Sequence, residues 1–527
     1  MTESVLNVRS KPIGPTGRSR SRLGITILAA VLTALGLTIA FDAYSGRIGI
    51  IAPRFEIIQN GATKIIRVPP GGNLQAAIAK AESGDIVELQ AGAVYYGPIK
   101  LPNKPLTEYV TIQSSSAAML PVDQRVSPAQ RSLMATILAR NSEEPAVSAA
   151  NGAHHYRFVG IEFAPKNGEY LYNLVLFGND EPIANVPHDL EIDRSYLHPF
   201  KTGTTRRGIA LNSSATTIKN SYIEGFAFPQ EETQAICGWS GTRNVHIINN
   251  YVEAGAENIM FGGSDPASAD LIPSDIEIRG NHLHKPAEWN GKATLKTLFE
   301  LKNAKRVQLI GNFLESNWGG AAIRVTVRNQ DGNAPFSTIE DVTIRDNIIN
   351  GSGDGINILG KDDTNPSQTL KRLNIVNNLF LNIGEGNGYS GSGYFIQIAD
   401  GEQIAVENNT VLNRGNAATF YGVMPRSIAF RNNFIGYGSY GVYGLADQRS
   451  AESRAIFQNN YFLNLNRISP AESFPPGNSL VRGLADVGFV NPGGGDYRLA
   501  ETSKFRVRAG SGKNIGSDIS AAEFIRR

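Results

Sequence analysis

Charged residues alternate with apolar residues in two short stretches of the chain, at positions 298–303 and 322–328. Successive side chains of a strand point to opposite faces, so each stretch reads as a half-buried strand with its charges on one face. The charged residues in question are Glu300, Lys302, Arg324 and Arg328. A lysine held near other cations can act as a general base, and a neighbouring arginine can neutralise the negative charge that then develops.

We therefore predict Lys302 as the base and Arg324 or Arg328 as the neutralising group. Glu300 would hold Lys302 in place or join a metal site. The competing interpretation is a ladder of solvated charges, because opposite charges on neighbouring strands stabilise a sheet without any catalytic role.

These stretches belong to an internal repeat. Short alternating strands end on an asparagine pair, or on Asn after Asp or Gly, at intervals of 24 to 35 residues from Asn220 onward. The later copies end at Asn250, Asn281, Asn312, Asn347, Asn378, Asn409, Asn433 and Asn460. A period of this length indicates a solenoid. We interpret the asparagines as structural, because Asn tolerates left-handed backbone geometry and its amide can bond to the Asn of the next coil.

Each unit continues with a second apolar doublet, a glycine-rich turn and a third strand such as Gly355–Leu359. Three short strands without a helix describe one coil of a β-helix. In this pattern the chain resembles the right-handed parallel β-helix, or pectin-lyase-like, superfamily over about residues 64–520. The resemblance implies an all-β solenoid of about ten coils with an N-terminal capping helix. We expect that helix after Asn73 as N-cap, ending at Gly84.

Residues in the same phase of consecutive coils lie about 4.8 Å apart and form columns that one sugar ring could span. The predicted outward column has a charged middle, from Glu300 to Arg328, between flanks of polar amides. The predicted substrate contacts are Asn258, Asn357, Gln397, Trp289, Trp318, Tyr394 and His284. Polysaccharide lyases on this fold use such a set: the base removes the proton α to a uronate carboxylate while a cation neutralises the carboxylate.

Other residues are weaker candidates for a catalytic or metal-binding role. Asp354, Asp362 and Asp363 could form the acidic cluster of a glycoside hydrolase on this fold, but they read as turn residues. His282 occupies a position that packed apolar residues fill in other units. The one cysteine, Cys237, reads as a buried small residue, and a single cysteine excludes an intramolecular disulfide. The Ca²⁺-binding carboxylates of the family are not recognisable, so the metal is unknown, with Ca²⁺ a possibility.

The N-terminus carries a targeting signal. Residues 1–22 contain five basic residues and one acidic residue, and residues 23–41 are uncharged and apolar. Such a run is long enough to cross a bilayer, and the preceding arginines place the N-terminus in the cytosol. We predict a basic tail (1–22), an uncleaved transmembrane anchor (23–41), a linker (42–63) and an exported β-helix domain (64–520). A cleaved signal peptide is the alternative.

The leading hypothesis is an exported, membrane-anchored polysaccharide lyase that acts on an acidic polysaccharide. The alternatives are a non-catalytic carbohydrate-binding or surface-structural β-helix and a hydrolase or epimerase, since fold does not imply function. A near-neutral body offers no electrostatic footprint for nucleic acid, and the oligomeric state stays open.

Overall fold

The computed structural model describes residues 38–41, 48–51, 55–61, 63–201, 203–384, 386, 388–445, 455–466, 474–506 and 514–522. The chain divides into two compact units, Met1–Phe55 and Glu56–Arg527. In the first unit, β1 (Thr38–Phe41) pairs antiparallel with β2 (Ile48–Ile51).

The predicted membrane anchor, residues 23–41, lies outside the described residues except for its last four. Those four form β1, so they are strand where the apolar run predicted helix. Among the described residues, no helix has the length and apolar character needed to cross a membrane. The anchor and the export of the second unit stay predictions.

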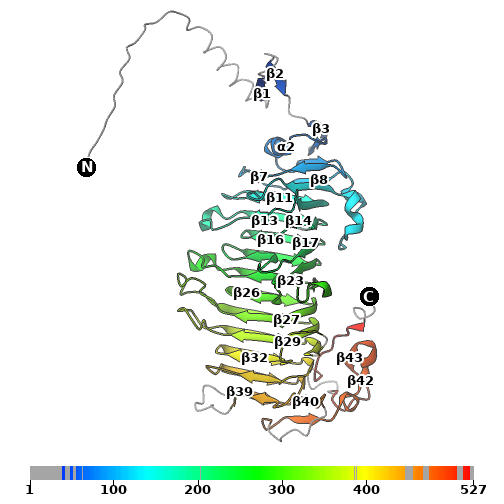
Figure 1. Cartoon of the computed structure of the whole chain (residues 1–527), viewed down its shortest axis with the longest axis vertical. Helices are drawn as coiled ribbons and strands as arrows, with labels where there is room; N and C mark the ends of the chain where they lie inside the picture. Colours follow the sequence, from blue (N-terminus) through cyan, green and yellow to red (C-terminus); the bar gives the residue numbers. More distant parts are fainter. Residues whose placement is uncertain are drawn as a thin grey trace, which may run out of the picture. The chain divides into compact units, whose positions relative to one another are not determined.

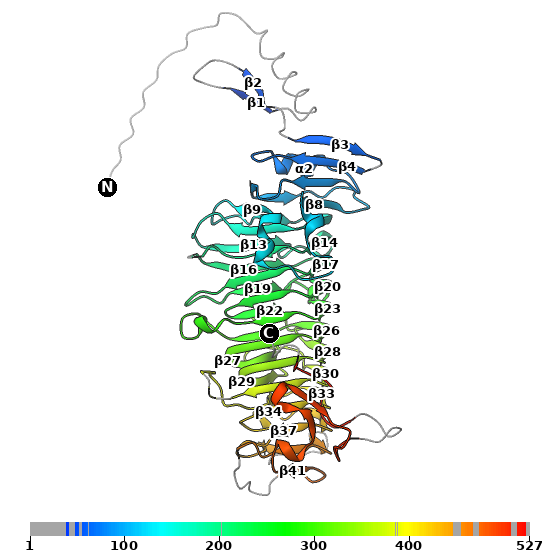
Figure 2. The same cartoon turned by 90° about the vertical axis from the view of Figure 1, so that its right-hand side faces the viewer.

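The second unit is a parallel β-helix, built from three stacks of short strands that run through successive coils (Figures 1 and 2). The first stack precedes the asparagine turn and contains β4 (Thr63–Val68), β5 (Ile86–Leu89), β8 (Val110–Ser114), β11 (His154–Val159), β14 (His188–Asp193), β17 (Ser214–Lys219), β20 (Arg243–Ile248), β23 (Ser274–Arg279), β26 (Ala304–Ile310), β28 (Ile339–Arg345), β30 (Lys371–Val376), β33 (Glu402–Glu407), β36 (Arg426–Arg431) and β39 (Ala455–Gln458).

The second stack follows the turn and contains β6 (Val94–Tyr96), β9 (Ala135–Ala139), β12 (Ile161–Pro165), β15 (Tyr196–Leu197), β18 (Tyr222–Phe226), β21 (Tyr251–Ala254), β24 (His282–His284), the first parts of β27 (Phe313–Thr326) and β29 (Ile348–Leu359), β31 (Leu379–Ile383), β34 (Thr410–Asn413), β37 (Phe434–Gly436), β40 (Tyr461–Leu463) and β41 (Ser479–Val481).

The third stack completes each coil and contains β7 (Ile99–Leu101), β10 (Val147–Ala149), β13 (Leu171–Phe177), β16 (Thr205–Leu211), β19 (Gln234–Gly238), β22 (Glu257–Phe261), β25 (Thr297–Leu301), the second parts of β27 and β29, β32 (Ile396–Ala399), β35 (Ala418–Phe420) and β38 (Val442–Tyr443). Neighbouring strands in all three stacks are parallel, as in the pair β25 and β27. The coils outnumber the predicted ten, because the first ones lack the asparagine motif that made the repeat visible.

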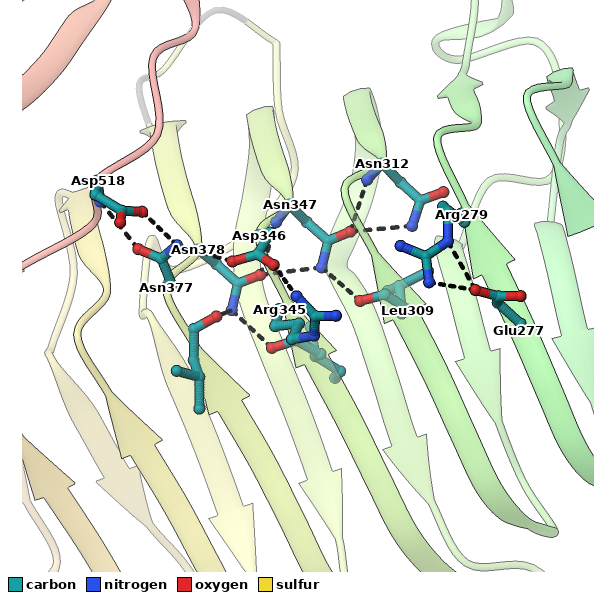
Figure 3. Close-up of polar contacts among 12 residues, drawn as sticks. Glu277, Arg279, Leu309, Asn312, Arg345, Asp346, Asn347, Asn377, Asn378 and Asp518 are labelled. Atoms are coloured by element: carbon teal, nitrogen blue, oxygen red, sulfur yellow. Dashed lines mark hydrogen bonds and ion pairs between the residues drawn. The ribbon is translucent and has the colours of Figure 1, made fainter. Parts of the chain in front are cut away.

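The asparagines form a buried ladder along the turn between the first and second stacks (Figure 3). The main-chain N–H and the side-chain Nδ2 of Asn312 both donate to Asn347 Oδ1, at 2.9 and 3.0 Å. Asn347 in turn donates to Leu309 O and to Asn378 Oδ1. The structural role predicted for these residues is confirmed. The left-handed residue, however, is the one before each ladder asparagine, such as Asp346 with φ 60°.

Extra segments lie at both ends of the coils. A hairpin of β3 (Glu56–Asn60) and β4 opens the unit, so β3 falls in the stretch 42–63 predicted as a linker. Helix α2 (Leu74–Lys80) follows, with the side chain of Asn73 accepting from Ala76 N–H as predicted. It ends at Lys80, before the predicted Gly84. The buried face of α2 is Leu74, Ala77 and Ile78.

The C-terminal segment folds back along the second stack, where Figure 1 shows it beside the later coils. It contains the antiparallel hairpin of β42 (Phe489–Asn491) and β43 (Asp496–Leu499). Phe489 and Phe505 pack on Phe434 of β37, and Asp518 bonds to Asn377 (Figure 3). This segment therefore shields the apolar outer face of the later second-stack strands from water.

Candidate functional site

The third stack places most of the predicted charged column in one row. Glu300 of β25 is aligned with Arg324 of β27, Arg324 with Asn357 of β29, and Asn357 with Gln397 of β32. The register follows from the inward residues between them, because Phe299 pairs with Ile323 and both are fully buried. Burial of one face fixes the alternation, so the other residues of these strands face outward.

Lys302 lies two residues beyond Glu300 and is half-buried. In the register of β25 and β27 the residue opposite Arg324 is Glu300, not Lys302. The next coil instead approaches Lys302 at Arg328, whose main-chain N–H donates to Lys302 O at 2.8 Å.

Glu300 is only 3% exposed, so its predicted solvent-facing position is wrong. Lys296, four residues earlier in the same coil, and Glu257 of the preceding coil cover it. Lys296 Nζ lies 3.7 Å from Glu300 Oε2 and 2.6 Å from Oε1 of the buried Glu257. Burial and the neighbouring Glu257 raise the pKa of Glu300, although Lys302 and Lys296 act against the rise. Burial also acts to raise the pKa of Glu257, but Lys296 and Gln234 hold it below its usual range. Glu300 therefore belongs to a buried carboxyl pair neutralised by Lys296, and sequence reasoning missed Glu257 and Lys296.

Arg328 is neutralised within the fold. Its guanidinium lies 3.3 Å from Asp362 Oδ1 and also pairs with Asp363. Asp362 accepts from the main-chain N–H groups of Asn329, Thr364 and Asn365, so it is the turn residue that the sequence predicted. Because its charge already has partners, Arg328 is a poorer candidate than Arg324 for binding an anionic ligand.

Asp354, also predicted to lie in a turn, instead lies within β29. Its carboxylate accepts from Ser392 N–H at 2.8 Å. Burial raises the pKa of Asp354, with main-chain N–H donors and the nearby Arg324 acting against the rise. The structure therefore does not gather Asp354, Asp362 and Asp363 into one acidic cluster, because Asp362 and Asp363 are committed to Arg328.

Arg324 and Lys302 lie near the carboxylates of Asp354 and Glu300, respectively, but are not paired with them. Within the described part of the chain, neither side chain makes a hydrogen bond or an ion pair, and Arg324 Nε is buried from solvent without a partner. A buried donor that is left unpaired costs about 1–3 kcal/mol, more for a charged group. An anionic group bound from solvent would satisfy this donor, which makes the surface at Arg324 a candidate anion site.

Polar and aromatic side chains extend the row toward later coils. Asn357 Nδ2 donates to Gln397 Oε1 at 3.3 Å, and both residues are half-buried. Beyond them lies a groove of about 440 Å³. Its lining includes Ser392, Tyr394, Gln397, Asn416, Thr419, Tyr440 and Tyr443. The predicted contacts Gln397 and Tyr394 thus share one groove. Tyr440 of the preceding turn and Tyr443 of β38 also line it, and the periodic pattern did not single them out.

Asn258 is not available to a ligand, contrary to prediction. It is fully buried, and its Nδ2 donates to Val252 O and His284 O. Its Oδ1 accepts from the buried Lys285 at 3.0 Å. The strand before it turns sharply at Gly255, which directs the amide into the corner between the second and third stacks.

The remaining predicted contacts are scattered. Trp318 stacks on Tyr389 at 4.6 Å and its indole N–H donates to Lys285 O, so one ring face is covered. Trp289 closes the short 3-10 helix Ala287–Trp289 and is half-buried. His284 lies on β24 of the second stack, where its Nδ1 is 2.8 Å from Tyr251 Oη. It is therefore not part of the row on the third stack.

A second groove, of about 950 Å³, lies on the second stack beside the segment Asp123–Ser127. Tyr222, Tyr251, His282 and Glu315 contribute to its lining. His282 Nε2 bonds to Glu315 Oε1 at 2.8 Å, so the ring is half-buried in contact with a carboxylate and not simply packed as predicted. In this groove His282 and Glu315 pair with each other, and Tyr251 donates to Glu253.

The second stack also contains a buried carboxylate, Glu162, whose shifted pKa makes the stability of the fold depend on pH. Glu162, 1% exposed, accepts from Thr136 and lies 2.9 Å from His198 Nε2 and 2.7 Å from Arg131 Nη2. Burial acts to raise its pKa, but these three partners lower it from 4.5 to about 2. Because the folded pKa lies below the unfolded one, the stabilisation is present above pH 4.5 and is lost as the pH falls toward 2.

We expect this carboxylate to contribute about 3 kcal/mol of pH-dependent stability, since one pKa unit corresponds to about 1.4 kcal/mol. Urea unfolding of the parent between neutral pH and pH 2 should show a steeper acid loss than unfolding of Glu162→Gln. The exposed Glu143→Gln is the control and should follow the parent. Equal acid profiles for the parent and Glu162→Gln would contradict the assignment.

No protein-family model and no curated protein sequence matches the chain. Solved structures that it is similar to include a PL6 family alginate lyase, with 12% identity, a TM-score of 0.45 and coverage of 79% of this chain and 53% of that one. A mannuronic acid specific family 6 lyase from human gut microbiota has 14% identity and a TM-score of 0.43, over 79% of this chain and 90% of that one.

A GH87 α-1,3-glucanase catalytic domain has 13% identity and a TM-score of 0.43, over 79% of this chain and 67% of that one. The chain thus spans about half the length of the first of these structures. The assignment of fold depends on the parallel pairing in the three stacks of this chain itself. The architecture implied by the pectin-lyase-like resemblance is confirmed: the chain is a parallel β-helix protein.

Proposed function

We propose that the chain is a polysaccharide lyase that cleaves an acidic, uronate-containing polysaccharide by β-elimination on the third stack. The observation that carries the proposal is the half-buried Arg324, whose Nε is buried without a partner while Arg328 and Lys296 are engaged by carboxylates. A half-buried guanidinium whose Nε has no partner favours an anionic ligand, and a uronate supplies one carboxylate for each sugar ring.

In the proposed step, Lys302 accepts the proton from the carbon α to the uronate carboxylate. Arg324 neutralises the carboxylate as negative charge moves onto it, which lowers the barrier to carbanion formation. The electron pair then forms the carbon–carbon double bond and expels the glycosidic oxygen at the β carbon. That oxygen needs a proton to leave as a hydroxyl.

Tyr394 is the proposed source of that proton. Burial, together with the nearby Asp354, raises the pKa of Tyr394, so its hydroxyl stays protonated at neutral pH. Tyr394 also lines the groove beside Gln397, where a neighbouring sugar of the polymer would lie. Asn357 and Gln397 offer amides to the sugar hydroxyls between the two sites.

A Ca²⁺ ion does not fit the carboxylates of this row. Glu257 and Glu300 are buried beside Lys296, and the pKa of Glu300 is raised, so they do not offer the set of ionised oxygen ligands that Ca²⁺ requires. The proposed step therefore depends on the chain's own cations.

The test is a screen of uronate polymers with the purified full chain, read as the ultraviolet absorbance of the unsaturated product. We expect one acidic polymer to give that absorbance, because elimination creates a double bond conjugated to the carboxylate. Reducing ends without absorbance would indicate a hydrolase. Binding without cleavage would leave a carbohydrate-binding protein, and either outcome overturns the proposal.

A further inference from the structure

Three of the chain's seven histidines gather at one corner of an early coil. His154 and His155 open β11, and His188 opens β14 on the next coil, where it is aligned with His154. One ring nitrogen of each residue lies within 4.8 Å of the others, and all three side chains are half-buried. The cluster belongs to the first stack, whereas the row at Arg324 belongs to the third.

The imidazole rings of these three histidines lie close together, with ring nitrogens facing one another. His154 Nδ1 and His155 Nδ1 are 2.7 Å apart, and the His154 and His188 rings stack at 4.7 Å with an interplanar angle of 4°. His155 stands edge-on to His154, at 79°. Two unprotonated nitrogens at such a separation repel each other, unless one of them carries a proton or both share a cation.

A carboxylate orients one of these rings. His188 Nδ1 lies 2.6 Å from Asp189 Oδ2, which holds the proton on Nδ1 and leaves Nε2 as the nitrogen with a lone pair. Carboxylates in this position fix the tautomer and ring orientation of metal-binding histidines and raise their basicity. On the other side, Tyr109 approaches the His155 ring at 5.5 Å.

Later coils carry other residues at the corresponding positions of the first stack. The second or third residue of these first-stack strands has positive φ, as in His155, Asp189, Asp275, Arg306, Asp341 and Arg372. In the later coils this column carries ion pairs between adjacent coils, with Arg306 Nε 2.5 Å from Asp275 and Arg372 Nε 2.5 Å from Asp341. The backbone geometry is therefore common to the coils, and the early corner differs in carrying imidazoles where later coils carry ion pairs.

We propose that His154, His155 and His188 bind one divalent transition metal ion, with Zn²⁺ as the best-fitting ion. Neutral imidazole nitrogens suit zinc, and three protein ligands with an open fourth position are the usual arrangement of a solvent-accessible zinc site. The ion links the coils of β11 and β14, as the Arg–Asp pairs link later coils. This inference is independent of the proposed lyase activity.

The experiment uses the full chain without a histidine tag, stripped with a chelator and titrated with ZnCl₂ by calorimetry, with metal content measured by mass spectrometry. We expect one equivalent of zinc per chain and a rise in the melting temperature when zinc is added. His155→Asn, which retains a residue suited to positive φ, and His188→Ala should each weaken zinc binding more than about 10-fold.

The matched control is His246→Ala, a half-buried histidine of β20 in the same stack, bonded to Glu277 at 3.0 Å. It should bind zinc as the parent does. Unchanged melting of the zinc-free variants shows that they fold. Absence of stoichiometric binding in the parent, or equal affinity in His155→Asn, His188→Ala and the parent, would overturn the proposal.

Discussion

The Lys302→Ala variant is expected to fold as the parent does and to lose turnover of the acidic polymer by a factor of about 10²–10⁴, the contribution of a positioned general base. Lys302 is half-buried and makes no ion pair within the described part of the chain, so its removal breaks no ion pair between coils, although it takes a positive charge away from the nearby Glu300. A solvent-facing charge contributes only about 0–1 kcal/mol to stability. Initial rates of product absorbance and the melting temperature measure the two effects separately.

Lys305→Ala is the matched control. Lys305 is also half-buried, but it lies on β26 in the first stack, away from the row at Arg324. It should retain full activity. If Lys302→Ala keeps the parental rate on the polymer found in the screen, Lys302 is not the base.

Arginine variants of the same row decide which guanidinium neutralises the substrate. Arg324→Gln should lower turnover about 10²–10³-fold, the typical effect of removing one donor to a developing oxyanion. Arg328→Gln should leave turnover much closer to the parental value, because Arg328 is committed to Asp362 and Asp363. The reverse order of effects would assign the role to Arg328.

The Lys285→Met variant is expected to lose about 3–5 kcal/mol of unfolding free energy, the range for breaking a buried charged network. Lys285 is fully buried, and its ammonium donates to Ala254 O, Gly255 O, Ala256 O and Asn258 Oδ1 at 2.6–3.2 Å. Methionine has a similar length but no donor, so several acceptors would be left unpaired. Burial lowers the pKa of Lys285 to about 7.

Urea unfolding at neutral pH measures this loss. The exposed Lys361→Met is the control and should unfold within about 0.5 kcal/mol of the parent, as surface substitutions usually do. Because the folded pKa of Lys285 lies below the unfolded value of 10.5, its protonation linkage makes the parent more stable as the pH rises from 7. A Lys285→Met protein as stable as the parent would show that the corner tolerates loss of the ammonium.

The sequence alone determined the architecture of each coil and the direction of its side chains. Phe299, Ile323 and Ile356 alternate with polar residues, and a side-chain period of two with a buried face leaves one arrangement of each strand. The asparagine repeat was equally readable, because each ladder amide bonds to its counterpart one repeat away, as Asn312 does to Asn347. Glu300, Arg324, Asn357 and Gln397 fell in one row for the same reason, since strand period and repeat length together set the register.

Only the tertiary structure decided which charges remain open to a ligand. Glu300 and Arg324 have the same alternation in sequence, yet Lys296 of the same coil and Glu257 of the preceding coil surround the first, while Nε of the second has no partner. From the sequence, Lys285 would be a surface lysine before a proline. In the structure, its ammonium donates to the three carbonyl oxygens of the turn Ala254–Ala256. Burial and pairing depend on groups contributed by other coils, and a single strand pattern holds no information about them. The alternation therefore determined the direction of each side chain, and the contacts between coils determined its chemistry.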